Sequence, residues 1–409
     1  MILMQQSSDK NVLDKITYLT GDFNTLGNIE ATPARTPFDE TVIEFLNDVS
    51  RELMRNPRSQ EYSDVITFAF WIRRGFVMRM KEEFENQERK NGRIRLGRGV
   101  AFHIAPSNVP VNFAYSLAAG LLTGNANIVR IPSRDFAEVE IICLALREVL
   151  ERYEELKRYC ILIRYERDKD INDALSYLCD TRIVWGGDGT IKELRRSQLP
   201  PRSTEITFAD RFSLAVIDSD AYAETENKSR VAEDFYNDTY FSDQNACTSP
   251  RVVVWMGNKK EEAKRIFWKE LYELVRKKYV FQDIQGIHKL ASAYLAAVRE
   301  LGVRVGRYGD NRIVRIKVLK LTKELMEWKN NGGCFFEYDC DDVMELRPLC
   351  DDKRCQTIGM YGNKEELTPL LLSGIKGVDR VVPMGKTMDF GMVWDGYDLV
   401  GQLTRVIVR

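Results

Sequence analysis

The sequence is poor in histidine, and its cysteines are scattered. Only two histidines occur in 409 residues, His103 and His288, and the eight cysteines follow no regular spacing and form no Cys-x-x-Cys pair. A zinc site built from Cys and His requires such spacing, so the sequence predicts no metal site. We interpret the cysteines as reduced thiols that mostly fill the core.

The sequence also lacks a large net charge and long apolar runs. A formal net charge of −1 gives no electrostatic basis for binding nucleic acid or an anionic membrane surface. The longest apolar runs, such as residues 116–124, are much shorter than the roughly 20 residues of a membrane-spanning helix. The N-terminus becomes polar after four residues and has neither the basic nor the apolar region of a secretory signal. We therefore expect a cytoplasmic protein.

What the sequence does contain is an alternation of helical and β-rich segments. Hydrophobic residues make up 44% of the chain, which is sufficient at this length for two domains. Apolar residues recur at helical spacing in residues 38–55 and 65–84. From residue 98, short β-rich runs alternate with helical stretches at about 109–123, 136–158, 170–179, 259–279 and 286–301. This alternation predicts two α/β units in series, each with a parallel, doubly wound sheet.

Ligands of such sheets bind beyond the carboxyl ends of the strands, and the first series has a polar turn there. In "HIAPSNVPVN", residues 103–112, Pro106 ends a strand and Asn108 stands where we expect a helix to begin, with Pro110 in its first turn. Asn108 either caps this helix or offers an amide donor to a developing oxyanion at the positive helix end.

Two further turns follow neighbouring β-rich runs. In "RIPSRD", residues 130–135, Ser133 either caps the next helix or contacts a ribose or phosphate together with the arginines. The turn "VWGGDGT" places three glycines between a strand and a helix: Gly186, Gly187 and Gly189. Glycines there allow close approach of a pyrophosphate, but a tight turn explains them equally well, and the G-x-G-x-x-G spacing is absent.

Cys247 lies in a polar loop, "DQNACTSPR", just before an apolar run that reads as a buried strand. A core cysteine usually has apolar neighbours, whereas Cys247 has small polar ones. An exposed thiol in a polar loop of a reduced protein is a candidate nucleophile.

Three stretches together resemble the LuxC-type acyl-CoA reductase family, the reductase of the bacterial bioluminescence fatty-acid reductase system. They are "GRGVAFHIAPSNVPVNFAYSLAAGLLTGNANIVRIPSRDF", "DQNACTSPR" and "VWDGYDLVGQLTR", and the likeness runs from about residue 95 to the C-terminus. More remotely, the chain is similar to the aldehyde dehydrogenase superfamily. The resemblance implies an aldehyde dehydrogenase-like α/β fold. Its expected parts are a helical segment plus a nucleotide-binding domain (1–208), a catalytic domain carrying Cys247 (209–385), and a segment that returns to the first domain and ends in an oligomerisation strand (386–409).

The resemblance also implies roles for particular residues. Cys247 matches the nucleophile that becomes acylated, and the Asn108 amide, with the Cys247 backbone N–H, would form the oxyanion hole. Pro132 and Ser133 match the adenosine-ribose site, with Arg130 in the place of a lysine. The turn containing Gly186, Gly187 and Gly189 would face the cofactor, and Glu345 in "MELRPL" would contact the nicotinamide ribose.

One departure from the superfamily pattern favours a reductase. Hydrolytic aldehyde dehydrogenases have a glutamate that activates water, and if Ser213 matches the serine of that segment, Phe208 takes the glutamate's place. Without that base an acyl-cysteine would survive to be reduced. The predicted activity is reduction of a fatty acyl thioester, delivered as acyl-CoA or by an acyl-donor protein, to the aldehyde. Alternatives are an acyl-phosphate reductase, an ordinary aldehyde dehydrogenase, and a non-catalytic binding protein on this fold.

Three further predictions concern the preferred nicotinamide cofactor, the role of His103 and the oligomeric state. Arg134 replaces a glutamate that would repel a 2′-phosphate, which favours NADPH over NADH, although Asp135 beside it would oppose this. His103 is either a proton donor or, as we favour, a packed strand histidine. In the tail "LVGQLTRVIVR", apolar residues alternate: Leu403, Val406 and Val408. We expect this strand to join a neighbour's sheet in a homo-oligomer; the alternative is a strand folded back on its own domain.

Overall fold

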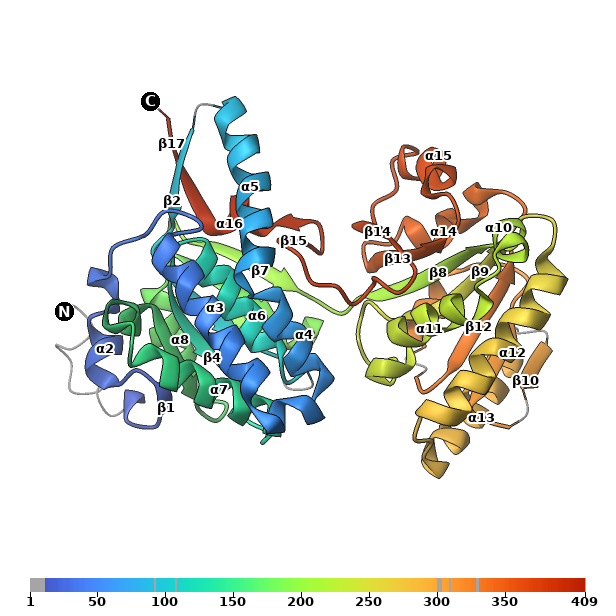
Figure 1. The fold of residues 1–409 in the computed structure, drawn as a ribbon, viewed down its shortest axis with the longest axis horizontal. Helices are drawn as coiled ribbons and strands as arrows, with labels where there is room; N and C mark the ends of the chain where they lie inside the picture. Colours follow the sequence, from blue (N-terminus) through green and yellow to red (C-terminus); the bar gives the residue numbers. More distant parts are fainter. Residues whose placement is uncertain are drawn as a thin grey trace. The chain divides into compact units, whose positions relative to one another are not determined.

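The protein is represented by a computed structural model that describes residues 12–91, 93–106, 109–299, 304–308, 310–328 and 331–408. The chain forms two compact units (Figure 1). Unit 1 contains the chain up to Ala209 together with Tyr397–Arg409, and unit 2 is Asp210–Gly396. The return to unit 1 therefore begins at Tyr397 rather than at residue 386. The preceding residues are tied to unit 2, where the buried Asp238 carboxylate accepts from the backbone N–H groups of Gly385 (2.6 Å) and Thr387 (3.0 Å).

Unit 1 is built on a doubly wound sheet whose strand order, within the described residues, is β1-β5-β4-β3-β6-β7. Its parallel strands are β3 (Val100–Ile104), β4 (Ala126–Arg130), β5 (Cys160–Arg164), β6 (Thr181–Trp185) and β7 (Thr204–Phe208). An antiparallel edge strand, β1 (Thr17–Thr20), pairs with β5. The chain runs outward from β3 through β4 to β5, then crosses back to β6 and β7. The winding direction thus reverses between β3 and β6, which is where such sheets bind ligands.

The helices of unit 1 follow the apolar periodicity, with shifted ends. They are α2 (Phe23–Gly27), α3 (Glu40–Arg55), α4 (Ser63–Trp71), α5 (Arg74–Asn91), α6 (Asn112–Leu122), α7 (Ala137–Leu150), α8 (Lys169–Leu178) and α9 (Asp188–Leu194), with short 3-10 helices at Ile29–Ala31, Pro57–Glu61 and Glu154–Tyr159. The helix expected over 65–84 is two helices, α4 and α5, and the Asn47 side chain accepts from the Arg74 N–H at the start of α5 (3.2 Å). Helix α6 begins at Asn112 with Val111 as its N-cap, so Pro110 precedes the helix instead of lying in its first turn.

Unit 2 contains a second, larger sheet with the order β10-β11-β12-β9-β8-β13-β14 in the described part of the chain. The parallel strands are β8 (Phe212–Asp218), β9 (Pro250–Met256), β11 (Ile313–Lys317), β12 (Cys334–Asp339), β13 (Cys355–Tyr361) and β14 (Arg380–Pro383); β10 (Arg304–Tyr308) is an antiparallel edge. Successive residues point to opposite faces, so Leu214 and Val216 enter one core and Ala215 and Ile217 the other.

Helices cover both faces of this second sheet. They are α10 (Ser219–Glu224), α11 (Lys228–Asp238), α12 (Lys260–Lys278), α13 (Asp283–Val298), α14 (Arg347–Cys350) and α15 (Thr368–Leu371), with 3-10 helices η4 (Tyr240–Ser242), η5 (Lys323–Glu327), η6 (Val343–Leu346) and η7 (Lys364–Leu367). Since each face packs against helices, the strands read in the sequence as nearly continuous apolar runs.

The C-terminal tail folds back on its own unit. After the short strands β15 (Val393–Trp394) and β16 (Tyr397–Asp398), α16 (Leu399–Leu403) leads into β17 (Thr404–Ile407), which pairs antiparallel with β2 (Ile94–Gly97). Leu403 is buried at the end of α16, so the expectation that it lies on an exposed strand is wrong. Val406 and Val408 remain 40% and 81% exposed.

Candidate functional site

Cys247 lies at the amino edge of the unit 2 sheet, in the loop that leads into β9. All eight cysteines are described and free of disulfides, and seven of them are buried, whereas Cys247 is partly exposed. Cys247 is therefore the thiol that a substrate can reach most readily.

The loop around Cys247 is held in an uncommon backbone conformation. Asp243 and Gln244 both have φ of 55°, a left-handed conformation that costs energy for residues other than glycine. Gln244 is fully buried, and its side chain donates to the Pro250 carbonyl (2.9 Å) and accepts from the Gly333 N–H (2.7 Å). This one amide thus ties the loop to the starts of β9 and β12.

The polar residues next to Cys247 are also used inside the protein. Thr248 and Ser249 are buried, so this loop is less exposed than its composition predicts. The Ser213 hydroxyl of β8 donates to the Cys247 carbonyl (2.8 Å), and the Thr248 hydroxyl contacts the Met388 sulfur (3.1 Å). The first bond holds the Cys247 backbone directly, and the second holds the next residue of the loop.

The Cys247 sulfur lies among groups that the sequence did not single out. Burial raises the pKa of the Cys247 thiol to about 12, and the Asp395 carboxylate adds to this rise. The Gln356 side-chain amide and the positive charge of Arg251 lower the same pKa. The resting sulfur is therefore a protonated thiol, which must lose its proton before it can act as a nucleophile.

Further charged residues act on the Asp395 carboxyl: Arg211, Asp379 and Arg380. Arg211 forms an ion pair with Asp379 (3.1 Å), and the Arg380 guanidinium lies 4.3 Å from the centre of the Trp394 ring. Among the described residues, some buried polar atoms of this region have no hydrogen-bond partner: Arg251 Nε, Gln356 Oε1 and Arg380 Nη1. Unpartnered buried polar atoms are rare in folded proteins and mark a place where a bound molecule could supply the missing bonds.

The predicted cofactor residues of unit 1 differ in their availability. The Arg130 guanidinium stacks on the Tyr165 ring (4.5 Å) and donates to the Tyr165 carbonyl (3.3 Å). Pro132 is buried, while Ser133 and Arg134 are exposed. Ser133 does not cap α7, whose N-cap is Phe136.

The glycines after β6 differ in their surroundings, since a Cβ on Gly186 would meet the Thr190 side chain at 3.2 Å. None of Gly186, Gly187 and Gly189 has a left-handed backbone, so turn geometry does not require glycine at these positions. A Cβ on Gly189 would meet no atom within 4 Å. Because β4, β3 and β6 are adjacent and parallel, this turn and the Ser133 loop lie at the same edge of the sheet. These residues fit a cofactor phosphate at that edge. Asn108 lies outside the described residues.

Glu345 does not lie near Cys247. Its carboxylate accepts from the N–H groups of Asp341 (3.2 Å) and Asp342 (2.9 Å) and from the Tyr338 hydroxyl, beyond the carboxyl end of β12. Cys247 precedes the amino end of β9, which runs parallel to β12. The two residues are therefore separated by at least the length of a seven-residue strand, on the order of 20 Å. Glu345 is thus wrong as a contact to a nicotinamide ribose beside Cys247.

Two other predicted positions in unit 1 are packed residues. The His103 ring is 1% exposed and hydrogen-bonded to Ser116 (2.7 Å) and Asn127 (3.0 Å), and burial lowers the pKa of His103 to about 4. This confirms the prediction that His103 is a packed histidine of a strand. Phe208 stacks on Trp185, with ring centres 3.6 Å apart.

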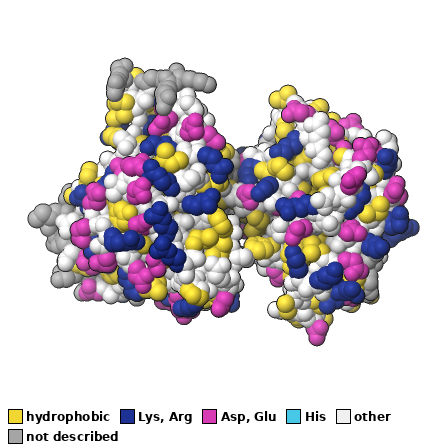
Figure 2. All heavy atoms as spheres, viewed as in Figure 1, with side chains coloured by type: hydrophobic (Ala, Val, Ile, Leu, Met, Phe, Trp, Pro, Cys, Tyr) yellow, Lys and Arg dark blue, Asp and Glu magenta, His cyan; other side chains and the backbone are white. Residues whose placement is uncertain are grey.

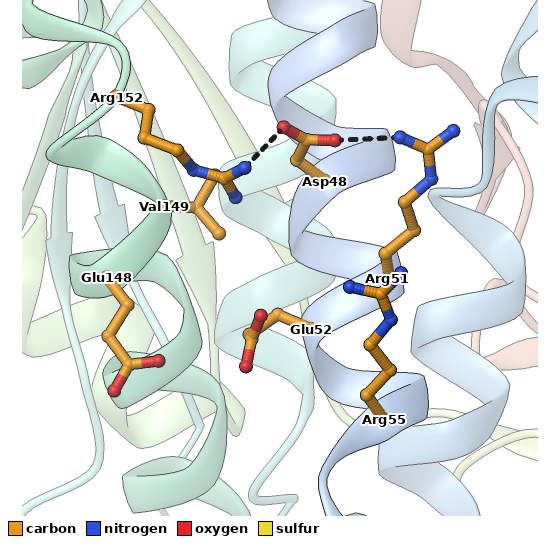
Figure 3. Close-up of a pocket in the computed structure, with 7 residues that line it drawn as sticks. All are labelled: Asp48, Arg51, Glu52, Arg55, Glu148, Val149 and Arg152. Carbon is orange, nitrogen blue, oxygen red and sulfur yellow. Dashed lines mark hydrogen bonds and ion pairs between the residues drawn. The ribbon is translucent and has the colours of Figure 1, made fainter.

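Two cavities in the described part of the chain lie elsewhere. One of about 300 Å³ is lined by Asp48, Arg51, Glu52, Arg55, Glu148, Val149 and Arg152 (Figure 3). Its charges neutralise each other, since Asp48 pairs with Arg51 (3.1 Å) and Arg152 (3.2 Å). The other, of about 280 Å³, lies between α12 and strands β10 to β12 and includes Trp268 and Arg315. Neither cavity contains a predicted site residue.

The described part of the chain contains no group of three or more His, Cys, Asp and Glu side chains placed to hold a metal ion. No helix in the described ranges is long and apolar enough to cross a bilayer. Acidic and basic side chains are mixed over the face shown in Figure 2.

Solved structures define the class of the fold. Aldehyde dehydrogenase 21 from Physcomitrella patens, in complex with the reaction product succinate, aligns with a TM-score of 0.63 at 12% identity, over 98% of this chain and 90% of that chain. The fold is therefore that of the aldehyde dehydrogenases.

The sequence defines the family more narrowly. Residues 15–281 match the family Acyl-CoA reductase (LuxC), and the chain belongs to this family. The long-chain acyl-protein thioester reductase of Photorhabdus luminescens is 22% identical over 316 residues, which are 76% of this chain and 63% of that protein. The protein of the same description from Vibrio harveyi is 24% identical over 319 residues, again 76% of this chain and 63% of that protein. The chain thus spans less than two thirds of the length of these relatives.

Proposed function

We propose that this protein reduces a fatty acyl thioester to the aldehyde with NADPH, through an acyl-cysteine formed on Cys247. The observation that supports this best is the placement of Cys247. It is the one cysteine that is not buried. Its loop is fixed by two buried side chains, that of Ser213 in β8 and that of Gln244 in the loop. The family supplies the reaction class, because curated relatives are described as long-chain acyl-protein thioester reductases.

In the first step, the Cys247 sulfur attacks the thioester carbonyl after losing its proton. A new S–C bond forms, and the thioester C–S bond breaks to release coenzyme A or the thiol of a donor protein. The Cys247 backbone N–H would donate to the oxyanion, and Asn108 remains the predicted second donor.

A reduced nicotinamide, when bound, supplies hydride to the acyl carbon. The C–S bond to Cys247 then breaks, the aldehyde leaves and the sulfur regains its proton. Ser133, Arg134 and the glycines after β6 would hold the cofactor phosphates at the carboxyl edge of the unit 1 sheet. The exposed Arg134 supports NADPH over NADH, because its guanidinium would bind the 2′-phosphate. The negative charge of Asp135, which would oppose this, is paired with Arg164 (2.9 Å).

Phe208 supports reduction rather than hydrolysis. It is 5% exposed and packs between the rings of Trp185 and Tyr397, so an apolar ring occupies the position where hydrolytic relatives are expected to have a base. Water is activated poorly without such a base, and an acyl-cysteine would persist.

A nicotinamide oxidation assay tests this function. Purified protein would be given NADPH or NADH with acyl-CoA thioesters of increasing chain length, with acyl phosphates, and with an acylated carrier protein. We expect thioester-dependent NADPH oxidation and aldehyde formation. Activity only with acyl phosphate, or only in the direction of aldehyde oxidation, would indicate the other enzyme classes. Cofactor binding without turnover of any substrate would indicate a binding protein.

The role of Cys247 is tested by Cys247→Ala, with Cys143→Ala as the matched control. Cys143 is a buried cysteine of unit 1. Loss of the nucleophile should reduce turnover by a factor on the order of 10³ or more, while nicotinamide binding stays unchanged. The control variant should keep its activity. An active Cys247→Ala protein would refute the acyl-cysteine mechanism.

A homo-oligomer is part of the same proposal. One edge of β17 pairs with β2; the exposed Val406 lies on this two-stranded ribbon, and the exposed Val408 follows it directly. Addition of the ribbon to a second copy would cover these side chains.

A further inference from the structure

The outer strands of the unit 2 sheet change character along the face that α12 covers. Ile313 of β11 and Phe335 of β12 belong to the buried apolar core on that face. Arg315 and Glu337 lie two residues further along the same strands, so they point to the same side of the sheet. At these positions the apolar core gives way to charged side chains and a cavity of about 280 Å³.

The lining of this cavity is rich in positive charge. It contains only two carboxylates, Glu261 and Glu337. Five cationic side chains line it: Lys264, Arg265, Arg304, Arg315 and Lys317. Like charges brought together in one cavity repel each other unless carboxylates of the protein or a bound anion neutralise them.

The protein's own carboxylates neutralise the two lysines. Asp339, the last residue of β12, forms ion pairs with both Lys317 (2.6 Å) and Lys264. Lys264 also pairs with Glu261 (3.0 Å). The lysine charges are therefore already used inside the protein.

The three arginines are not neutralised in this way. The Arg315 guanidinium approaches Glu337 only to 3.5 Å, and Arg315 Nε is buried without a partner among the described residues. Arg265 and Arg304 are exposed and form no ion pair within the described part of the chain. The unpaired positive charge of the cavity thus resides on guanidinium groups.

Gly306 leaves space beside the Arg315 guanidinium. It lies on β10 directly opposite Arg315, and a Cβ at this position would lie 3.2 Å from Arg315 Nη2. Gly306 does not have a left-handed backbone, so its conformation does not require glycine. The Arg315 guanidinium also lies 5.4 Å from the centre of the Trp268 ring, which supports it against α12. Its N–H groups therefore border open space where a ligand could bind.

We propose that this cavity binds a small molecule that carries a phosphate group, with Arg315, Arg304 and Arg265 as its contacts. Guanidinium groups bind phosphate oxygens through paired, charge-assisted hydrogen bonds, and a phosphate dianion matches more than one unpaired arginine. The inference goes beyond the proposed function. Lys317 is the last residue of β11, at the carboxyl side of the sheet, whereas Cys247 precedes the amino end of β9.

Calorimetric titration of the full chain with pyrophosphate tests this proposal without substrate or nicotinamide. The wild type should bind pyrophosphate with a Kd below about 1 mM. Arg315→Met keeps a long side chain against Trp268 but has no N–H, and it should weaken binding by about tenfold to a hundredfold. Lys269→Met is the matched control: Lys269 is an exposed residue of α12 that does not line the cavity. Its effect should be less than about twofold.

A second variant tests the open space beside Arg315. Gly306→Asp introduces a carboxylate that would pair with the Arg315 guanidinium, and it should weaken pyrophosphate binding at least as much as Arg315→Met. The thermal unfolding midpoint of each variant without ligand shows that the protein is folded. Titration with inorganic phosphate and with adenosine monophosphate distinguishes the source of the phosphate. Tighter binding of the nucleotide would identify a nucleotide as the ligand, and equal binding would identify the phosphate group alone.

Three results would overturn the proposal. One is a wild type that does not bind any of the three probes. Another is a folded Arg315→Met protein that binds pyrophosphate as tightly as the wild type. The third is loss of binding in Arg134→Glu but not in Arg315→Met, which would place the anion at the proposed cofactor site of unit 1. Loss or retention of activity in Cys247→Ala has no bearing on these titrations, so the proposed function and this site can fail separately.

Discussion

Asp395 should make the folded protein less stable at alkaline pH. Burial raises the pKa of the Asp395 carboxyl from its usual 3.8 to about 7; Arg211 and Arg380 oppose this rise, and Asp379 adds to it. Above pH 7 the unfolded chain ionises this group freely, whereas the folded protein must ionise it in a buried place. The raised pKa therefore destabilises the folded state above pH 7, and this penalty disappears as the pH falls from 7 towards 4.

The size of the effect follows from the two pKa values of Asp395. A rise from 3.8 to about 7 corresponds to about 4 kcal/mol at pH 8. Near pH 4.5 the unfolded carboxyl is mostly ionised and the folded one protonated, and about 1 kcal/mol remains. Asp395→Asn removes the charge, and asparagine also accepts a left-handed backbone.

Urea unfolding at pH 8 and pH 4.5 measures this difference. Asp395→Asn should be more stable than the wild type by up to about 4 kcal/mol at pH 8 and by about 1 kcal/mol at pH 4.5. Asp283→Asn, at an exposed position of the same unit, is the control and should change stability little at either pH. An Asp395→Asn protein that is less stable than the wild type at pH 8, or a difference independent of pH, would refute this reasoning.

Three further predictions concern unit 1. Burial lowers the pKa of His103 to about 4, so this residue should cost the wild type about 3 kcal/mol of unfolding free energy between pH 7 and pH 4. The His103→Gln protein should lack this loss. The control variant His288→Gln, at an exposed position, should retain it. Arg134→Glu should abolish a preference of kcat/KM for NADPH over NADH, and an NADH-preferring wild type would contradict the assignment. Val406→Asp should lower the sedimentation coefficient by weakening an oligomer formed through β17; an unchanged profile would exclude this strand as the interface.

The sequence predicts the two sheets well, because parallel strands buried on both faces leave apolar runs such as β8 and β9. It misses β1, β2, β7, β10 and β14, whose short stretches lack a continuous apolar pattern and are stabilised by pairing with neighbouring strands. It also places the family likeness from about residue 95, whereas the family match begins at residue 15. The N-terminal helices are therefore part of the family region.

The site is predictable only in part. Cys247 is recognisable from the polar composition of its loop. Gln356 and Asp395 are not, because they meet one another only after the start of β13 and the segment after β15 come together. Glu345 was assigned to the site from a short motif, but it lies at the opposite edge of the sheet. A short motif gives no information on which edge of a sheet it will occupy.

The distribution of the cysteines has a consequence for oxidative damage. Peroxide attacks thiolates, and its rate depends on both ionisation and access to the sulfur. Seven thiols are buried, and the eighth, Cys247, is kept protonated because its surroundings raise its pKa to about 12. The resting protein should therefore withstand oxidants that inactivate enzymes with a permanently ionised cysteine, and Cys247 should become vulnerable only when it is deprotonated.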